Sequence, residues 1–321
     1  MYDIISVGDA TLDTFVKIKE ASVIYSPDKS RQFLCLSYGD KIPIESLDQQ
    51  IAGNAANNAI GSARLGLKAA FYSVVGDDET GGKIKKKMKE EGVSLEYLKV
   101  DKGKPSNYSV VLNFNSERTI LIYHLPRVYS LPKFSPTKWI YYTSVGKNHI
   151  KLNNQIVRFV KKNGVKLGYN PGTFQIARGL ESMKPLLEVC EVLFVNREEA
   201  ESLVGRHVGI KPLLEKLYQQ GPKIVVITDG HRGSYAYDGK NFWSMGIFPV
   251  KVVEMTGAGD AYSTGFMASI VSGNSLSEAM RWGTANSASV ITKVGPQAGL
   301  LHKNEMREWL KRYARIKPEL L

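Results

Sequence analysis

The chain is organised around the stretch Met255–Phe266, which reads Met-Thr-Gly-Ala-Gly-Asp-Ala-Tyr-Ser-Thr-Gly-Phe. The two glycines that flank Ala258 allow a tight turn in which consecutive backbone N–H groups are exposed. Apolar residues then recur at near-helical spacing, at Ala261, Phe266 and Ile270. The stretch therefore predicts a glycine loop that opens a helix, and the unpaired N–H groups of such a terminus bind anions.

Asp260 lies in the first turn of this predicted helix, within reach of the anion site. A carboxylate repels phosphate, but it can take a proton from a hydroxyl group that attacks phosphorus. An acidic residue in a first helical turn also complements the helix dipole. The stretch by itself leaves both interpretations of Asp260 open, the catalytic and the structural one.

The composition is that of an ordinary globular protein, with 321 residues of which 43% are hydrophobic and 23% are charged. This length allows one large α/β domain, or such a domain with a small appendage. Cys35 and Cys190 are the only cysteines, and they stand far apart without a metal-ligand pattern. We therefore expect buried free thiols, not a disulfide or a zinc site.

A net charge of +12 would attract polyanions, including nucleic acid. The basic residues are scattered, however, except in the run from Lys83 to Lys89, where Ile84 and Met88 are predicted to face inward. That run is typical of a solvated helix face, so nucleic-acid binding is not expected. The sequence shows no signal-like start and no apolar stretch of about 18 residues, which predicts a cytoplasmic protein without membrane contact.

Strands and helices alternate regularly along much of the chain, which predicts βαβ units and a parallel sheet. Residues 2–8 form the first predicted strand. Further strands are predicted at 139–144, 165–170, 192–195 and 223–228, and helices at 153–163, 183–188, 197–204 and 211–219.

Two extended blocks, 15–50 and 109–126, interrupt this pattern with short β-type segments and turns. Residues 115–117 read as a hairpin connection in the second block. The blocks predict a small β-stranded lid outside a main domain made of 1–14, 51–108 and 127–321. This lid could cover an active site or contact a second copy of the chain in a homodimer, and the two roles are compatible.

Polar residues stand where ligands gather in an open α/β sheet. Asp13 follows the first strand, and carboxyl ends of strands border the ligand crevice in such sheets. Asn54 and Asn57 lie three apart on a predicted helix that opens at Gly53, and their amides could bind sugar hydroxyl groups. An acidic turn at Asp13 and close helix packing through alanines are the alternatives.

Six short motifs follow one another along the chain: the Asp13 turn, Ala52–Asn57, Gly76–Asp78 with Gly81, Asn196–Glu199, Thr228–Gly230 with Gly233, and Thr256–Asp260. With these motifs in this order and spacing, the chain resembles the ribokinase-like (PfkB) carbohydrate kinases over nearly its whole length. The resemblance implies a three-layer α/β fold, with a mostly parallel central sheet flanked by helices and a small β-stranded lid. It also implies transfer of the γ-phosphoryl group of ATP, with Mg²⁺, to a hydroxymethyl group.

The resemblance implies roles for individual residues at matching positions. Asp260 matches the catalytic base, and the anion hole that receives the transferred group corresponds to Gly257, Ala258 and Gly259. Glu199 matches the residue that holds magnesium through water, which suits an ion that keeps several waters. Sugar hydroxyl groups would be held by Asp13, Gly53, Asn54 and Asn57. The nucleotide would be held by Asn196, Thr228, Gly230 and Asn286.

Three departures from the family pattern bear on specificity. Glu254 stands where the family loop often begins with aspartate; this argues against activation by K⁺, although a glutamate could still offer an oxygen ligand. Asn54 follows Ala52 and Gly53 where ribokinases tend to have Gly-Gly-Lys, which weakens ribose as the substrate. Arg127 replaces part of a small Gly-Ala pair and could meet a substrate phosphate, or lie exposed at the surface.

A sugar kinase is thus expected, and three other functions remain open. A nucleoside kinase on the same scaffold would stack Phe33 or Tyr38 on the base. A phosphosugar kinase is favoured only if Arg127 faces the pocket. A sugar- or nucleotide-sensing protein without activity is the third, and the presence of Asp260, Asn196 and Glu199 argues against it.

Overall fold

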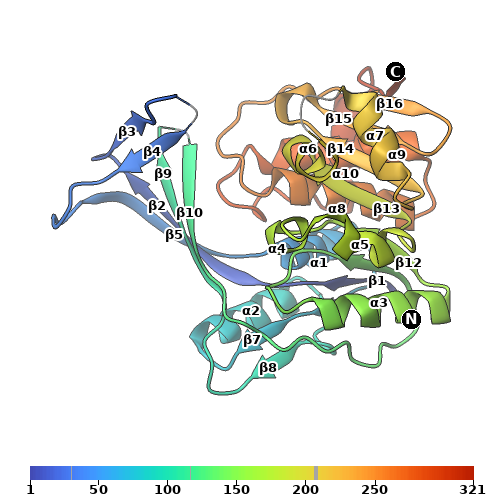
Figure 1. Cartoon of the computed structure of the whole chain (residues 1–321), viewed down its shortest axis with the longest axis horizontal. Helices are drawn as coiled ribbons and strands as arrows, with labels where there is room; N and C mark the ends of the chain where they lie inside the picture. The colour runs from blue at the N-terminus through green and yellow to red at the C-terminus, as the bar shows by residue number, and fades with distance from the viewer. Residues whose placement is uncertain (30, 116, 206–208) are drawn as a thin grey trace.

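The computed structural model describes residues 1–29, 31–115, 117–205 and 209–321. The main body is built on a nine-stranded sheet, and a second sheet, of four strands, belongs to the part that projects from it in Figure 1. Within these residues no helix has the length and apolar character needed to cross a membrane.

The nine-stranded sheet is mostly parallel, as the βαβ pattern predicts. Its six neighbouring strands from β6 to β14 run parallel, and β15, β16 and β17 continue it antiparallel. In spatial order the strands are β17 (Glu319–Leu320), β16 (Phe242–Met245), β15 (Ser234–Tyr237), β14 (Ile224–Thr228), β13 (Val192–Asn196), β12 (Lys166–Tyr169), β11 (Thr137–Tyr142), β1 (Tyr2–Val7) and β6 (Ala69–Tyr72).

Helices cover both faces of this sheet and make the three layers. Along β1, Ile5 and Val7 pack toward one helical layer, and Ile4 packs toward the other, because successive strand residues point to opposite faces. The first layer contains α3 (Ile150–Asn163), α5 (Gly179–Leu187), α6 (Arg197–Val204) and α7 (Ile210–Tyr218). The second layer contains α1 (Asn54–Arg64), α8 (Ala258–Val271), α9 (Leu276–Val290) and α10 (Lys303–Arg312). Helix α2 (Glu79–Glu90) packs beside α1. The short helix α4 (Thr173–Ile176) precedes α5 in the first layer.

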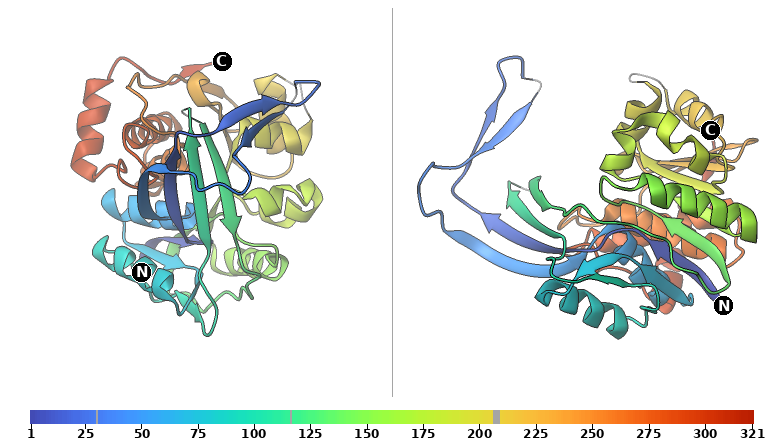
Figure 2. Two further views of the ribbon diagram at one scale, coloured as in Figure 1. Left: turned by 90° about the vertical axis from the view of Figure 1, so that its left-hand side faces the viewer. Right: turned by 60° about the horizontal axis from the view of Figure 1, so that its bottom comes forward.

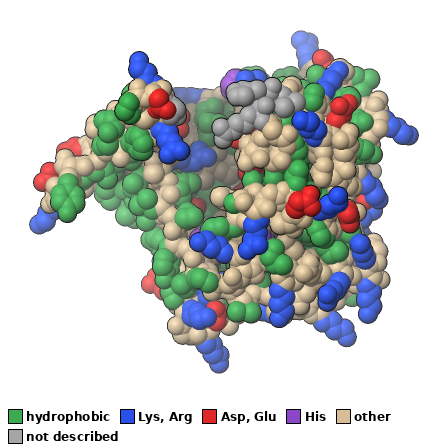
Figure 3. All heavy atoms as spheres, viewed as in Figure 1, with side chains coloured by type: hydrophobic (Ala, Val, Ile, Leu, Met, Phe, Trp, Pro, Cys, Tyr) green, Lys and Arg blue, Asp and Glu red, His purple; other side chains and the backbone are tan. Residues whose placement is uncertain are grey.

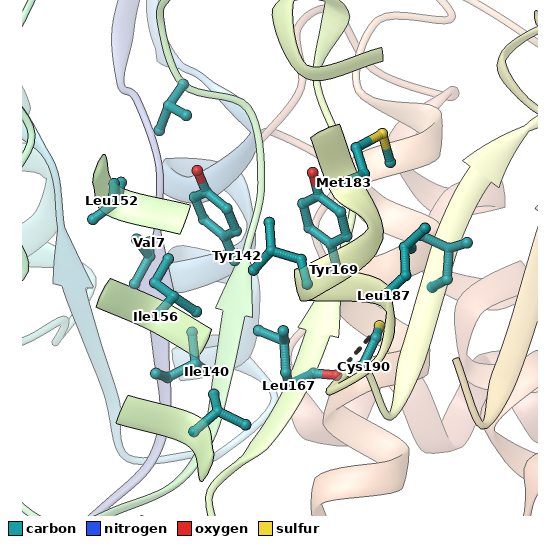
Figure 4. Packing of buried hydrophobic residues seen from close by; sticks show 14 of the residues in the cluster. Val7, Ile140, Tyr142, Leu152, Ile156, Leu167, Tyr169, Met183, Leu187 and Cys190 are labelled. Carbon is teal, nitrogen blue, oxygen red and sulfur yellow. Dashed lines mark hydrogen bonds between the residues drawn. The ribbon is translucent and has the colours of Figure 1, made fainter. Parts of the chain in front are cut away.

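Figure 4 shows part of the first core layer, where the rings of Tyr142 and Tyr169 stack with centroids 5.5 Å apart. The Cys190 thiol is buried nearby, with its Sγ 3.7 Å from the Leu167 carbonyl oxygen. Both cysteines are free, as predicted, but Cys35 is only partly buried. The expectation of a buried thiol is therefore wrong for Cys35, because its strand belongs to a hairpin outside the core.

The four-stranded sheet, called the outer sheet below, has the strand order β10-β9-β2-β5 and stands away from the main body (Figures 1 and 2). Strand β2 begins four residues before the first predicted block and β5 ends two residues after it, so Asp13 lies within β2 instead of in a turn. Residue 116 of the predicted hairpin connection lies outside the described residues. The strands of the outer sheet are β2 (Thr11–Ile18), β5 (Ile44–Ala52), β9 (Tyr108–Phe114) and β10 (Glu117–Tyr123). Beyond them lies a hairpin of β3 (Ser22–Tyr25) and β4 (Gln32–Cys35). A separate pair, β7 (Val74–Gly76) and β8 (Lys99–Asp101), lies near α2.

Candidate active site

A cleft with a volume of about 280 Å³ lies at the carboxyl ends of the parallel strands, on the side of the main body that faces the outer sheet. Figure 3 shows the hollow between these two parts. Neighbouring strands each bring one polar residue to the cleft, at or just after the strand end: Ser144, Asn170, Asn196 and Thr228. This is the position at which open α/β sheets bind ligands.

The first turn of α8 forms one wall of the cleft, as the glycine loop predicts. Gly257 has φ 80°, and a Cβ at this position would collide with Pro296, so glycine is required. No side chain caps the helix, and within the described part of the chain the N–H groups of Gly259 and Asp260 have no acceptor. The Ala258 N–H instead donates to the Met255 carbonyl at 3.3 Å. The Gly257 N–H likewise has no acceptor among the described residues, so the amides available for an anion are those of Gly257, Gly259 and Asp260.

Asp260 lines the cleft beside these amides. Burial raises the pKa of its carboxyl group to about 6, and the negative charge of Asp13 acts in the same direction. The Asn57 amide donates a hydrogen bond of 2.8 Å to Asp260 Oδ2 and partly offsets this increase. A carboxylate with such a pKa is ionised at neutral pH but still basic enough to accept a proton.

Two of the predicted sugar-binding residues remain available to a ligand. Asn54 lines the cleft. Asp13 is buried, burial raises its pKa to about 6, and its Oδ1 has no hydrogen-bond partner among the described residues. Such an orphaned acceptor fits a substrate hydroxyl group, because buried polar atoms in native proteins are nearly always paired.

The other two residues have structural contacts instead. Gly53 caps α1 with φ 101°, and a Cβ there would lie 2.6 Å from the Asp9 carbonyl oxygen, so close backbone approach explains the glycine. Asn57 is buried, and both ends of its amide have protein partners, Asp260 on one side and Gln297 Nε2 at 2.9 Å on the other. Asn57 is therefore hydrogen-bonded to the proposed base, and its contact with a sugar stays a prediction.

Asn196 and Glu199 line the cleft at the start of α6 and form a reciprocal capping box. The Asn196 side chain accepts from the Glu199 N–H, and Glu199 Oε2 accepts from the Asn196 N–H, both at 2.8 Å. Burial raises the pKa of Glu199, and the charge of Asp260 contributes. The described residues hold no cluster of three or more acidic, histidine or cysteine side chains suited to a metal. One carboxylate fits Mg²⁺, which is commonly bound by one or two carboxylates, waters and substrate phosphates.

A second cavity of about 400 Å³ adjoins the cleft and shares Thr228, Met255, Ala258 and Gly259 with it. Its further walls are largely apolar and include Gly230, Ile247, Phe248, Val250, Val252 and Ile291. The shared residues make one continuous binding region, with a polar part at α8 and an apolar part beyond it.

Asn286 does not line this second cavity. It is fully buried, donates to the Ala261 carbonyl at 2.8 Å and accepts from the Leu301 N–H at 3.0 Å. It therefore ties α9 to α8 and to the loop before α10, and its predicted contact with the nucleotide has no support from the lining of this cavity. From α9, the residues that reach the cavity include Thr284 and Ser287.

The family model described as "pfkB family carbohydrate kinase" matches residues 16–304. The chain belongs to this family. It is accordingly a kinase, a phosphotransferase that acts on an alcohol group, and the predicted family and ribokinase-like fold are confirmed. Kinases of this family use ATP with Mg²⁺.

Named relatives of this pfkB kinase have several substrates. The chain is 28% identical over 290 residues to a ribokinase of Haemophilus influenzae, covering 85% of this chain and 91% of the relative. It is 25% identical over 307 residues to an ATP-dependent 6-phosphofructokinase of Thermoanaerobacterium thermosaccharolyticum, covering 92% and 89%. The structure of Arabidopsis thaliana ribokinase complexed with ribose and ATP superposes with a TM-score of 0.81 at 22% identity, covering 97% and 99% of the two chains.

Arg127 takes neither of the two positions expected for it, in the cleft or exposed at the surface, and a different arginine lines the cleft. Arg127 is fully buried, pairs with Asp101 at 3.0 Å and donates to the Pro105 carbonyl, so it does not face the cleft. Arg118 of β10 lines the cleft instead, and among the described residues no carboxylate lies within salt-bridge distance of it. The sequence analysis missed Arg118, although its position next to the predicted hairpin connection places it at the tip of the lid block.

Proposed function

We propose that this kinase transfers the γ-phosphoryl group of ATP to a hydroxymethyl group of a small carbohydrate, with Asp260 as the catalytic base. The observation that carries the proposal is the Asp260 carboxyl group, whose pKa burial raises to about 6, beside the unpaired amides of the first turn of α8. A base and an anion site side by side are what phosphoryl transfer to an alcohol requires.

On the acceptor side, Asp13 and Asn54 hold hydroxyl groups of the sugar. The unpartnered Oδ1 of Asp13 accepts from one hydroxyl, and the Asn54 amide can donate and accept. These contacts orient the hydroxymethyl group toward Asp260, which takes its proton as the oxygen attacks phosphorus. Orientation of the reacting groups supplies a large share of the rate enhancement in such a reaction.

On the donor side, the N–H groups of Gly259 and Asp260 donate to the transferred phosphoryl group. Arg118 adds a positive charge from the outer sheet, which would act as a lid and exclude water. Magnesium, when bound with the nucleotide, neutralises charge on its phosphates. Glu199 and Asn196 would hold the ion through water, and Thr228 and Gly230 would hold the nucleotide in the second cavity.

A monovalent cation is a further possible ligand of this region. Glu254 Oε2 accepts from the Gly295 N–H at 2.7 Å, while Glu254 Oε1 and Thr256 Oγ1 are buried without partners among the described residues. Buried unpaired oxygens call for an explanation, and a bound cation would satisfy both. Higher initial rates in potassium chloride than in tetramethylammonium chloride of equal ionic strength support this site, and equal rates contradict it.

The test of the function is a panel of monosaccharides, sugar phosphates and nucleosides, each assayed for ADP formation with ATP and Mg²⁺. We expect turnover with at least one unphosphorylated sugar. Neither Phe33 nor Tyr38 lines the cleft or the adjoining cavity, and Arg127 is buried, so the features named for a nucleoside or phosphosugar kinase are not in place. Preference for a nucleoside or sugar phosphate, or ligand binding without any turnover, would contradict the proposal.

The outer sheet can also join two copies of the chain. Residues alternate between the faces of a strand, so Leu121 and Tyr123 lie on the face of β10 opposite to Arg118, and both are about half exposed. Exposed apolar side chains on a projecting sheet suit a symmetric contact between identical copies. Sedimentation velocity should show a dimer that Leu121→Lys weakens and that Val128→Lys, on the main body, leaves intact. A wild-type monomer at all concentrations would contradict this contact.

A further inference from the structure

Four connections join the outer sheet to the main body, and all four come close to one buried carboxylate. The connections are residues 8–10, residue 53, residues 102–107 and residues 124–136. Asp9 lies in the first of them, directly after β1, and it is only 6% exposed. The proposed reaction does not use this residue. A charged group at this place can hold the outer sheet in one orientation.

The Asp9 carboxylate binds the fourth connection and the loop after β11. It accepts hydrogen bonds from the Tyr129 hydroxyl at 2.8 and 3.0 Å and from the Gly146 N–H at 3.0 Å. The Tyr129 ring is buried, so this contact lies inside the protein. The second connection lies against the backbone of Asp9, since a Cβ at Gly53 would stand 2.6 Å from the Asp9 carbonyl oxygen.

The third connection joins the same cluster through Asn107 and Pro105. The Asn107 Oδ1 accepts from the Leu125 N–H of the fourth connection at 3.3 Å, and Arg127 of the fourth connection donates to the Pro105 carbonyl. Both Asn107 and Arg127 act on the Asp9 carboxyl group and favour its charged form. Asn107 Nδ2 and Arg127 Nε are also buried donors without a partner among the described residues. A cluster so rich in donors is stabilised by a negative charge on Asp9.

We propose that Asp9 is a positioning residue that, in its charged form, holds the outer sheet in the orientation that the reaction needs. Asp13 of β2 and Arg118 of β10 belong to this sheet, so their positions at the site depend on its orientation. The neutral acid accepts hydrogen bonds less well than the carboxylate, and it loses its attraction to Arg127. Loss of the charge therefore loosens the outer sheet and weakens binding of the acceptor.

The charge of Asp9 changes near neutral pH. Burial raises its pKa to about 7, and the hydrogen bonds from Tyr129 and Gly146 oppose this increase. The titratable or charged side chains that act on Asp9 or are acted on by it are Tyr72, Tyr129, Tyr142 and Arg127.

None of these neighbours changes its charge in the same range of pH. Burial raises the pKa of all three tyrosines, so they stay neutral, and the Arg127 guanidinium stays positive. His149 bonds to the Gly146 carbonyl, and burial lowers its pKa. Among the described residues of the cluster, Asp9 is therefore the group that becomes charged as the pH rises through about 7.

The first test measures the orientation of the outer sheet without any ligand. Nitroxide labels at Ser46→Cys in β5 and Asn154→Cys in α3 report the distance between the two parts by pulsed electron paramagnetic resonance. Both positions are exposed, and the background is Cys35→Ser, with the buried Cys190 left in place. We expect a narrow distance distribution at pH 8.5 and a broader one at pH 5.5.

Asp9→Asn keeps the shape of the side chain and should give the broad distribution at both pH values. Tyr129→Phe removes a hydrogen bond that lowers the pKa of Asp9, so the midpoint of the transition should move to higher pH. Asp3→Asn is the matched control on β1, because Asp3 contacts Lys68 and Lys138 instead, and it should behave like the wild type. A wild-type distribution that does not change with pH, or an unmoved midpoint in Tyr129→Phe, would overturn the role of Asp9.

The second test rests on the proposed function and uses the monosaccharide of the panel with the highest turnover. At pH 8.5, Asp9→Asn should raise KM for this sugar at least about 5-fold, as expected from the loss of charge-assisted hydrogen bonds. Calorimetry with ADP should show unchanged affinity, because the nucleotide binds to the main body. Equal KM in Asp9→Asn and the wild type would refute the link to the acceptor. Absence of turnover with every sugar would refute the proposed function instead, while the label distances would still decide the role of Asp9.

Discussion

The Asn57 amide lies 2.8 Å from Asp260 Oδ2 and joins the start of α1 to the start of α8 across 203 residues of sequence. The sequence analysis assigns Asn57 to the sugar, and in the structure its amide donates to Asp260 and accepts from Gln297. Asn57 therefore orients the proposed base and sets its proton affinity.

Replacing Asn57 by alanine should move the acidic limb of the pH–rate profile to higher pH. Burial raises the pKa of Asp260 to about 6 and the Asn57 hydrogen bond lowers it, so loss of the bond raises it further. The rate should fall most near pH 6 and recover at higher pH. Asn58→Ala is the matched control, because the Asn58 amide contacts Ser6 and Thr264 instead of the base. An unchanged limb in Asn57→Ala would refute this role.

Asp260→Asn should make the protein more stable at neutral pH. The pKa of Asp260 is higher in the folded chain than in the unfolded one, so its contribution to stability is complete below about pH 4 and is lost as the pH rises through about 6. The full shift in the pKa of Asp260 corresponds to about 3 kcal/mol in the free energy of unfolding. Because Asp260 is partly exposed, the expected gain in stability is roughly 1–2 kcal/mol. Urea unfolding at pH 7.5 and at pH 4 measures it. A gain that persists at pH 4 would contradict the electrostatic cause.

Glu199→Gln should raise the Mg²⁺ concentration that gives half-maximal activity by about 10-fold, since the loss of supporting metal contacts commonly costs 10- to 100-fold. Glutamine can still accept the hydrogen bond from the Asn196 N–H, so the start of α6 should remain folded. Glu198→Gln is the control, because Glu198 is exposed and does not line the cleft. Equal Mg²⁺ requirements in the two variants would exclude Glu199 from the metal site.

Substitution of Arg127 should lower the stability of the fold, and substitution of Arg118 should lower the activity. Arg127→Leu removes the buried partner of Asp101, which keeps only its exposed pair with Lys104, and takes the guanidinium donor from the Pro105 carbonyl. It should lower the free energy of unfolding by about 2–3 kcal/mol. Arg118→Leu changes an exposed side chain and should leave stability unchanged while lowering kcat. Urea unfolding and steady-state kinetics on both variants test this pair, and the reverse pattern would show that the assignment is wrong.

Most of the fold could be predicted from periodicity and glycine placement. The helix predicted at 197–204 is observed as α6, Arg197–Val204, because a strand end, an N-cap asparagine and an apolar spacing all agree there. The outer sheet was harder to delimit, since β2 follows β1 after only Gly8, Asp9 and Ala10. The glycine and the acidic residues at this point predict a turn that extends to Asp13, whereas β2 already begins at Thr11.

Site residues could be predicted where the backbone conformation forms the site. They were harder to predict where the site depends on hydrogen bonds between side chains and distant residues. The Gly257 turn follows from local sequence. By contrast, the contacts of Asn57 and Asn286 depend on Gln297, Ala261 and Leu301, which are distant along the chain or on another helix. No spacing rule reveals whether an asparagine amide will meet a ligand or a neighbouring element.

The most direct test of the central claim is phosphate transfer by Asp260→Asn, measured as formation of the sugar phosphate by ³¹P NMR with the best sugar from the panel. Asparagine keeps the shape of the side chain but cannot accept the proton. We expect kcat to fall by about 10²–10⁴-fold, the usual contribution of a general base, while calorimetry shows unchanged nucleotide affinity. Sugar phosphate formed at the wild-type rate would contradict the account.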